Sequence, residues 1–251
     1  MSKTAYFEVD SDGKILRGMK HISEQHKEIA FILVHGYFSS NKIGPHRLYV
    51  NIANEISSRY GDCYRCDLTG MGESDGDITN VTLDAHIKDL KNILQHVTND
   101  CRKDIIIISH SMGCNLVLGL MQSASYRFRG IIFLAPFFGS EEIFKNVFHQ
   151  SNQIKDLETQ GYTYRNGLYA DKSFFDDNTH FNSFIKAINT SKTAINIIAA
   201  KSDQFIPLEM NELLRKTGEN VTFVYIDDCD HNFLTKQSEL IKNLCEIIEN
   251  N

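Results

Sequence analysis

Short, uninterrupted apolar runs alternate along the chain with longer segments whose apolar residues recur at helical spacing. Such runs are typical of strands buried on both faces, and the spaced segments are typical of helices that cover a sheet. The runs fall at 29–34, 63–68, 105–108, 129–136, 194–200 and 221–226, and the helical segments at 45–60, 82–97, 114–121, 207–216 and 234–248. This alternation predicts an α/β fold with a mostly parallel sheet and helices on both faces.

Two further strands are predicted ahead of this alternation. Residues 4–9 and 14–20 alternate between apolar and polar side chains, and the segment Asp10-Ser11-Asp12-Gly13 separates them. Glycine accepts the positive φ that a tight hairpin turn requires. We therefore expect an antiparallel pair at the start of the chain and eight strands in the sheet.

Residues 137–193 break the alternation. They lack buried-strand runs and are rich in aromatic side chains, including Tyr162, Tyr164 and Tyr169. We predict that residues 1–136 and 194–251 form one core, and that 137–193 form a cap over the carboxyl edge of the sheet, where α/β proteins bind ligands. The three tyrosines are candidate substrate contacts. The aromatic residues either line a hydrophobic pocket or form the small core of the insertion itself.

Composition and charge limit the classes of partner that we expect for this protein. A chain of 251 residues with 42% hydrophobic residues fits one large α/β domain with an insertion. The formal net charge is −6, and lysines and arginines are scattered singly, so we expect neither nucleic acid nor stable membrane association. The N-terminus has no apolar stretch of signal-peptide length, so we expect a cytoplasmic protein. A homodimer is compatible with the sequence.

Six cysteines are spread through the predicted strands and helices, and we expect reduced thiols. Cys63 and Cys66 form a C-x-x-C pair, which is a spacing found in redox and zinc sites. In a strand, however, residues three apart point to opposite faces. No second pair stands at metal-site spacing, so we interpret both cysteines as structural.

The isoleucine run at 105–108 leads directly into Ser109-His110-Ser111-Met112-Gly113, and an apolar helical segment follows. This order predicts a strand, a sharp turn and a helix, with Ser111 at the tip of the turn. A serine on such a corner exposes its hydroxyl beside helix N-terminal N–H groups, which can stabilise an oxyanion. The Met112 N–H is one candidate oxyanion donor.

A serine hydroxyl becomes a good nucleophile only when a base takes its proton, and the base needs an orienting acid. Asp203 and His231 each follow a predicted strand and precede a predicted helix, which brings them to the same sheet edge as Ser111. Alternatives to Asp203 are three late aspartates and one in the cap: Asp227, Asp228, Asp230 and Asp177. We expect His35 and His110 to lie at the substrate pocket, where they orient backbone or solvent.

The order Ser111, Asp203, His231 is that of α/β-hydrolases. Five motifs together resemble this superfamily over nearly the whole chain: His35-Gly36-Tyr37, Asp67-Leu68-Thr69-Gly70-Met71-Gly72-Glu73-Ser74, His110-Ser111-Met112-Gly113, Ser202-Asp203 and Asp230-His231-Asn232-Phe233. The chain looks most like bacterial cinnamoyl (feruloyl) esterases and their monoacylglycerol-lipase-like, serine aminopeptidase S33-type relatives. The segments Gly161-Tyr162 and Phe174-Phe175-Asp176-Asp177 resemble the hairpin-bearing cap of those esterases.

The resemblance implies an α/β-hydrolase fold and hydrolysis of a small-molecule carboxylic ester through an acyl-enzyme, with no cofactor and no metal. It also implies that the Tyr37 N–H is the second oxyanion donor. One position departs from the G-x-S-x-G pattern, because Ser109 stands where the first glycine is usual. Serine adds only a hydroxymethyl group there, so we expect it to be tolerated.

Other functions remain open at this stage. A thioesterase or acyltransferase acting on acyl thioesters would use the same three residues, as would a monoacylglycerol lipase or a peptidase of the proline-releasing kind. A non-catalytic ligand-binding protein is the alternative from a different class, because a fold alone does not determine function. The complete set of Ser111, Asp203 and His231 favours an enzyme.

Overall fold

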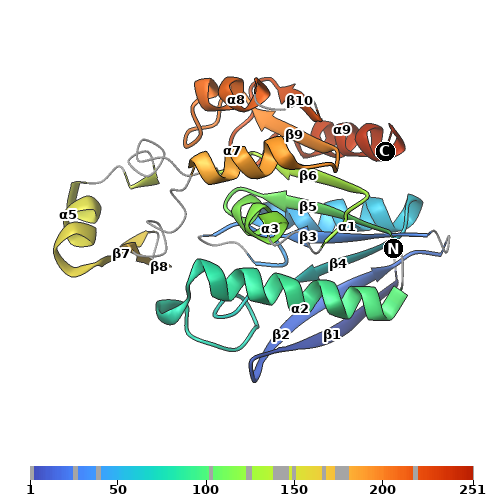
Figure 1. Cartoon of the computed structure of the whole chain (residues 1–251), viewed down its shortest axis with the longest axis horizontal. Helices are drawn as coiled ribbons and strands as arrows, with labels where there is room; N and C mark the ends of the chain where they lie inside the picture. The colour runs from blue at the N-terminus through green and yellow to red at the C-terminus, as the bar shows by residue number, and fades with distance from the viewer. Residues whose placement is uncertain are drawn as a thin grey trace.

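The computed structural model describes residues 3–24, 28–37, 41–101, 104–122, 126–137, 147–148, 151–165, 168–172, 181–216 and 220–250. Within this part of the chain, eight strands form one sheet in the order β1-β2-β4-β3-β5-β6-β9-β10 (Figure 1). The strands are β1 (Lys3–Ser11), β2 (Lys14–Ile22), β3 (Ile29–Val34), β4 (Asp62–Cys66), β5 (Asp104–His110), β6 (Gly130–Leu134), β9 (Ile195–Ala200) and β10 (Val221–Ile226). The predicted eight-stranded sheet is confirmed.

Strand direction follows from the connections. β1 and β2 are antiparallel, β2 joins β4 antiparallel, and the neighbours from β4 to β10 are parallel. The β1–β2 turn consists of Asp12 and Gly13, which both have positive φ (55° and 76°), as a two-residue hairpin turn requires. The parallel strands need crossover connections, and the chain supplies helices for them.

The helices that cover the sheet are α1 (Leu48–Arg59), α2 (Leu83–Cys101), α3 (Gly113–Gln122), α7 (Phe181–Thr190), α8 (Leu208–Arg215) and α9 (Gln237–Asn250). The predicted helix at 45–60 begins later than expected, because His46 and Arg47 adopt left-handed φ values of 46° and 61°. A short 3₁₀ turn, η1 (Pro45–Arg47), occupies that stretch instead. Among the described residues, none of the helices is long and apolar enough to cross a membrane.

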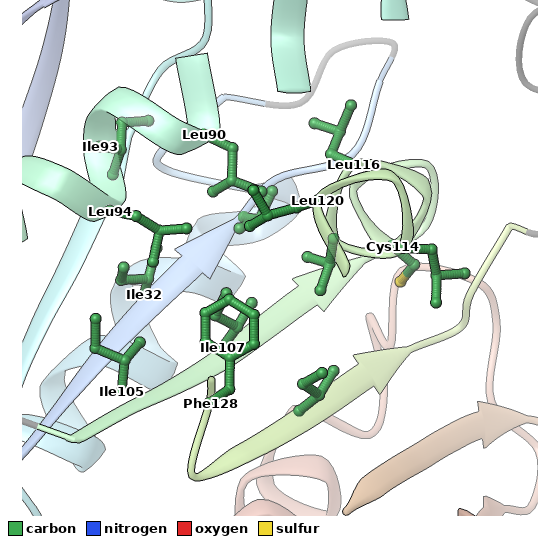
Figure 2. Packing of buried hydrophobic residues seen from close by; sticks show 14 of the residues in the cluster. Ile32, Leu90, Ile93, Leu94, Ile105, Ile107, Cys114, Leu116, Leu120 and Phe128 are labelled. Carbon is green, nitrogen blue, oxygen red and sulfur yellow. The ribbon is translucent and has the colours of Figure 1, made fainter. Parts of the chain in front are cut away.

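Two apolar clusters lie on the two faces of the sheet, as the helix-covered layers predict. Ile105 and Ile107 of β5 join the cluster beneath α2 and α3, whereas Ile106 and Ile108 join the cluster beneath α1 and α9. This alternation is the two-residue period of a strand buried on both sides. Figure 2 shows the first cluster, where leucines of α2 and α3 cover the strands: Leu90, Leu94, Leu116 and Leu120 above Ile32, Ile105 and Ile107.

Cys63 and Cys66 lie in β4 and point to opposite faces, as predicted. Cys63 belongs to the cluster beneath α1, and Cys66 belongs to the cluster beneath α2. Both thiols are free and buried, and burial raises the pKa of each. Their environment is that of inert packing residues, since a reactive cysteine needs an exposed thiol with a lowered pKa.

The predicted cap contains α5 (Ser151–Gln160) and a two-stranded hairpin of β7 (Tyr162–Arg165) and β8 (Leu168–Asp171). In Figure 1 this yellow segment lies at one end of the sheet. The hairpin that the resemblance implied is present. The later helix α7 belongs to another layer, because its Ala187 and Ile188 join the cluster beneath α3.

Candidate active site

Ser111 lies between the end of β5 and the start of α3, on the sharp turn that its motif predicts. Its φ is 53°, a left-handed value that costs a non-glycine residue free energy unless its surroundings enforce it. The Ser111 N–H donates to the Leu134 carbonyl across 3.0 Å, and the Ser111 carbonyl accepts from the N–H groups of Cys114 and Phe137 at 3.1 and 3.2 Å. Backbone hydrogen bonds therefore hold the corner in place.

Two glycines allow the loop after β3 to approach this corner closely. A Cβ atom on Gly113 would lie 2.5 Å from the carbonyl oxygen of His35, and a Cβ atom on Gly36 would lie 3.0 Å from Ser111 Cβ. Both contacts involve backbone or the serine itself, so neither can relax easily. The glycines in H-G-Y and S-M-G thus have a shared steric role.

His231 follows β10 and joins Ser111 to Asp203. Its Nε2 is 2.8 Å from Ser111 Oγ, and its Nδ1 is 2.7 Å from Asp203 Oδ2. The Asp203 and His231 side chains are only 2% and 7% exposed. The structure therefore brings together the three residues that the sequence indicated, from the loops after β5, β9 and β10.

Asp203 is fixed through its second oxygen. Oδ1 accepts hydrogen bonds from the backbone N–H groups of Phe205 and Ile206 at 2.8 and 2.9 Å, which leaves Oδ2 directed at His231. Two of the three late aspartates have other partners. Asp227 pairs with Lys201, and Asp230 Oδ1 accepts from the N–H groups of Asn232 and Leu234. Asp177 lies outside the described residues.

His35 holds the peptide that follows it. Its Nδ1–H donates to the Gly36 carbonyl across 2.7 Å, and its Nε2 accepts from the Leu68 N–H across 3.2 Å. Burial lowers the pKa of His35, which favours the neutral ring that this pattern needs. The Gly36 carbonyl and the Tyr37 N–H belong to one planar trans peptide. Fixing the carbonyl therefore fixes the direction of the N–H that the resemblance marks as an oxyanion donor.

His110 lies behind the corner and bonds to backbone. Its ring is 5.1 Å from the His231 ring between centroids, and its Nε2–H donates to the His231 carbonyl across 2.9 Å. Burial, and then the proximity of His231, lower the pKa of His110 to about 3. Its Nδ1 accepts from the phenol of Tyr49, a residue that sequence reasoning missed.

Ser109, the departure from the glycine pattern, is buried against Cys114. Its side chain is buried, and its hydroxyl donates to Cys114 Sγ across 3.4 Å. The neighbouring Cys114 Sγ in turn lies 3.4 Å from the Ser109 carbonyl oxygen. The small side chain of Cys114, at the start of α3, therefore leaves room for the hydroxymethyl group of Ser109.

A third apolar cluster joins the hairpin and α5 to the loops that carry the site. It includes Met112 after the corner, Leu157 of α5, Ala170 of β8 and Ile206 after β9. The partly buried Tyr37 packs against it. Burial raises the pKa of the Tyr37 phenol, and the charges of nearby Asp171 and Tyr169 add to that rise. The hairpin therefore lies against the loop after β3.

The three predicted cap tyrosines gather on one face of the hairpin. The ring centroid of Tyr162 is 5.5 Å from that of Tyr169, and Tyr164 is 5.9 Å from Tyr169. Tyr164 is 58% exposed. The opposite face carries the buried Thr163 and Ala170, so small residues make the contact with the third cluster. A substrate contact for the tyrosines stays a prediction.

Like Tyr49, Arg165 lies near the site although no sequence motif indicated it. Its guanidinium carbon lies 4.7 Å from the centroid of the Phe205 ring, and that ring meets the His231 ring edge-on at 5.2 Å. Arg165 shares the hairpin face of Thr163, as the alternation along β7 requires. The hairpin is thus linked through Phe205 to the loop that carries Asp203.

Comparisons with known proteins identify the family and the fold. The family model described as serine aminopeptidase, S33, matches residues 25–172. Among solved structures, Est1E from Butyrivibrio proteoclasticus with bound ferulic acid superposes with a TM-score of 0.82 at 18% identity, covering 97% of this chain and 98% of that chain. Mouse alpha/beta hydrolase domain-containing protein 10 gives a TM-score of 0.75 at 17% identity, with 99% of each chain covered.

An alpha-beta serine hydrolase homologue from Coxiella burnetii gives a TM-score of 0.67 at 16% identity, covering 100% of this chain and 98% of that chain. A search of curated proteins found no match. At these identities the solved structures establish the fold, and the family model establishes a serine hydrolase of the α/β-hydrolase type. Because that model matches more than half of the chain, the chain belongs to the serine aminopeptidase S33 family of α/β-hydrolases.

Proposed function

We propose that the protein hydrolyses carboxylic esters through an acyl-enzyme on Ser111. The observation that carries this proposal is the continuous hydrogen-bond series from Asp203 through His231 to Ser111 Oγ. The fixed carboxylate selects the tautomer in which His231 Nδ1 carries the proton, and Nε2 is then free to take the proton of the serine hydroxyl.

In the first half-reaction, Ser111 Oγ attacks the ester carbonyl while its proton passes to His231 Nε2. The Tyr37 and Met112 N–H groups bind the oxyanion of the tetrahedral intermediate, and His35 holds the Tyr37 peptide for this task. The intermediate collapses, and the departing alkoxide takes the proton from His231. In the second half-reaction, His231 deprotonates a water that attacks the acyl carbonyl, and Ser111 regains its proton as the acid leaves.

For the substrate we propose short-chain, aryl or cinnamoyl-type esters. Tyr162 and Tyr169 stack at 23° between ring planes on the hairpin face opposite Thr163 and Ala170, and they present an aromatic surface on which a flat group can pack. Tyr169 lies near enough to Tyr37 for its charge to raise the pKa of the Tyr37 phenol. The hairpin packs beside the Tyr37 loop, through the third apolar cluster. The structure of Est1E with ferulic acid supports the same class of acyl group. No metal or organic cofactor enters the proposed chemistry.

Turnover of p-nitrophenyl butyrate by wild type and Ser111→Ala tests the proposal. We expect hydrolysis by wild type, and loss of roughly 10³-fold or more in kcat for the variant, because the nucleophile is removed. Ser57→Ala is a matched control. Ser57 is also buried, but it lies in α1, where its hydroxyl donates to the Asn54 carbonyl. Wild-type rates in purified, folded Ser111→Ala would show that the proposal is wrong.

A substrate panel then separates the members of this enzyme class. We expect methyl ferulate and short-chain esters to be hydrolysed faster than long-chain monoacylglycerols. Faster turnover of an acyl thioester than of the oxygen ester of the same acid would indicate a thioesterase. Hydrolysis of aminoacyl arylamides in preference to both would indicate a peptidase.

A further inference from the structure

A chain of hydrogen bonds runs behind Ser111 and joins the loop after β3 to the loop after β10. The Gly36 N–H lies 3.4 Å from Tyr49 Oη, Tyr49 Oη lies 2.8 Å from His110 Nδ1, and His110 Nε2 lies 2.9 Å from the His231 carbonyl oxygen. Tyr49 and His110 are each at most 3% exposed. Two side chains thus connect the loop of one proposed oxyanion donor with the backbone of the proposed base.

Only one arrangement of protons satisfies every member of this chain. A carbonyl can only accept, so His110 Nε2 must carry a proton and donate to His231. A neutral imidazole then has its acceptor at Nδ1, and the Tyr49 hydroxyl must donate to it. The Tyr49 oxygen then accepts from the Gly36 N–H. The low pKa of His110 keeps its ring neutral at every pH near neutrality.

The side chain of Tyr49 is itself fixed by its surroundings. Tyr49 lies in the first turn of α1, and a Cβ atom on Gly44 would lie 2.5 Å from Tyr49 Cδ2, so the ring packs directly on backbone. The ring meets His110 edge-on, with 5.9 Å between centroids and 64° between planes. The phenol oxygen therefore cannot follow His110 if that ring turns.

His231 is held at both ring nitrogens and also at its own carbonyl, because His110 donates to the latter. A shift of the His231 backbone would change the distances to Ser111 and Asp203 together. We propose that Tyr49 and His110 are positioning residues that hold the His231 backbone where its ring can serve both partners. This inference rests on the proposed ester hydrolysis, in which His231 is the base.

Tyr49→Phe removes the hydrogen bond that holds the His110 ring at Nδ1, while the His231 carbonyl still accepts from Nε2. We expect kcat for p-nitrophenyl butyrate to fall roughly tenfold while KM changes by less than about twofold, because the substrate contacts stay and the base is misplaced. Tyr64→Phe is the matched control. Tyr64 is equally buried, but its phenol donates to Asp100 of α2. The kcat of Tyr64→Phe should equal that of wild type.

Two variants of His110 separate positioning from packing. The amide nitrogen of His110→Gln reaches the place of Nε2 and can donate to the His231 carbonyl, whereas the amide of His110→Asn reaches only the place of Nδ1. We expect His110→Gln to keep kcat within about threefold of wild type, and His110→Asn to lose roughly tenfold or more. Equal losses in the two variants, or none in either variant or in Tyr49→Phe, would overturn the proposal.

A spectroscopic measurement keeps this test separate from that of the proposed function. In protein with ¹⁵N-labelled histidine rings, we expect His110 to carry its proton on Nε2 in wild type, and we expect the resonance of the unprotonated Nδ1 to shift in Tyr49→Phe, because that nitrogen loses its hydrogen-bond donor. Absence of ester turnover by wild type would sink the proposed function, and the NMR result would still decide whether Tyr49 donates to His110. An unchanged Nδ1 resonance in Tyr49→Phe would contradict the inference.

Discussion

Asp203→Asn is the substitution whose effect the hydrogen bonds define most sharply. The Asp203 Oδ1 position accepts two backbone N–H groups, at 2.8 and 2.9 Å, so the oxygen of an asparagine amide must occupy it. The amide nitrogen then occupies the Oδ2 position, 2.7 Å from His231 Nδ1, and presents N–H groups to it. Two donors cannot face each other, so His231 must move its proton from Nδ1 to Nε2.

That tautomer cannot act as a base toward Ser111, because Nε2 already carries a proton and faces Ser111 Oγ. The equivalent change in a serine protease lowers kcat by about 10⁴, which corresponds to about 5 kcal/mol of lost transition-state stabilisation. We expect a loss of the same order for kcat on p-nitrophenyl butyrate. KM should change little, since Asp203 is buried behind the imidazole.

Asp230→Asn is the matched control for this experiment. Asp230 lies next to His231 in the sequence, but its Oδ1 accepts from the N–H groups of Asn232 and Leu234, a role that an amide oxygen can also fill. We expect its kcat to stay within about threefold of wild type. If Asp203→Asn kept kcat within tenfold of wild type, or if both variants lost activity equally, the proposed role of Asp203 would be refuted.

Two further predictions concern stability. Burial lowers the pKa of His21 to about 4, below its ordinary value of 6.5. Between these two pH values the unfolded state therefore binds more protons than the folded state, so acid favours unfolding. The contribution of neutral His21 to stability is complete above pH 6.5 and is lost as the pH falls towards 4. In denaturant titrations, His21 should lower the free energy of unfolding by up to about 1.4 kcal/mol for each unit of falling pH in this range. His21→Gln should lack this pH-dependent loss, and an equal slope in wild type and variant would contradict the prediction. Gly113→Ala should lower the free energy of unfolding by roughly 1–3 kcal/mol, because its Cβ atom meets the backbone oxygen of His35. Gly119→Ala should cost less in the same assay, because its Cβ atom meets only the flexible end of Ile87; equal losses in the two variants would count against this steric explanation.

The fold was predictable because its central strands are buried on both faces. The run Ile105–Ile108 contains no polar side chain that could face solvent. Its side chains pack alternately into the two apolar clusters. Element ends were less predictable. The helix that begins at Leu48 was expected at Pro45. The residue types of His46 and Arg47 do not indicate the left-handed backbone that both adopt.

The principal site residues could be located because parallel strands deliver their following loops to one edge. Ser111, Asp203 and His231 each follow a strand, and their hydrogen bonds match the expected order. Contacts between distant side chains had no such signal. Nothing in the pattern around Tyr49 shows that its phenol reaches His110, because that contact depends on how α1 packs on the sheet.

The cap was the hardest segment to interpret from sequence. Its aromatic residues drew attention to Tyr162 and Tyr164, yet the hairpin face that packs against the third apolar cluster carries Thr163 and Ala170. Register decides which face turns inward, and a strand of four residues offers too few positions to show a two-residue period. The same register brings Arg165 over Phe205, beside His231.

The most direct test of the central claim is covalent labelling of the folded protein with a fluorophosphonate, followed by peptide mass analysis. Such a probe reacts with a serine that a neighbouring base has activated. We expect one adduct per chain, located on the peptide that contains Ser111, with loss of ester turnover in proportion to labelling and no adduct in Ser111→Ala. An unlabelled wild-type protein, or an adduct on another residue, would contradict the claim that His231 activates Ser111.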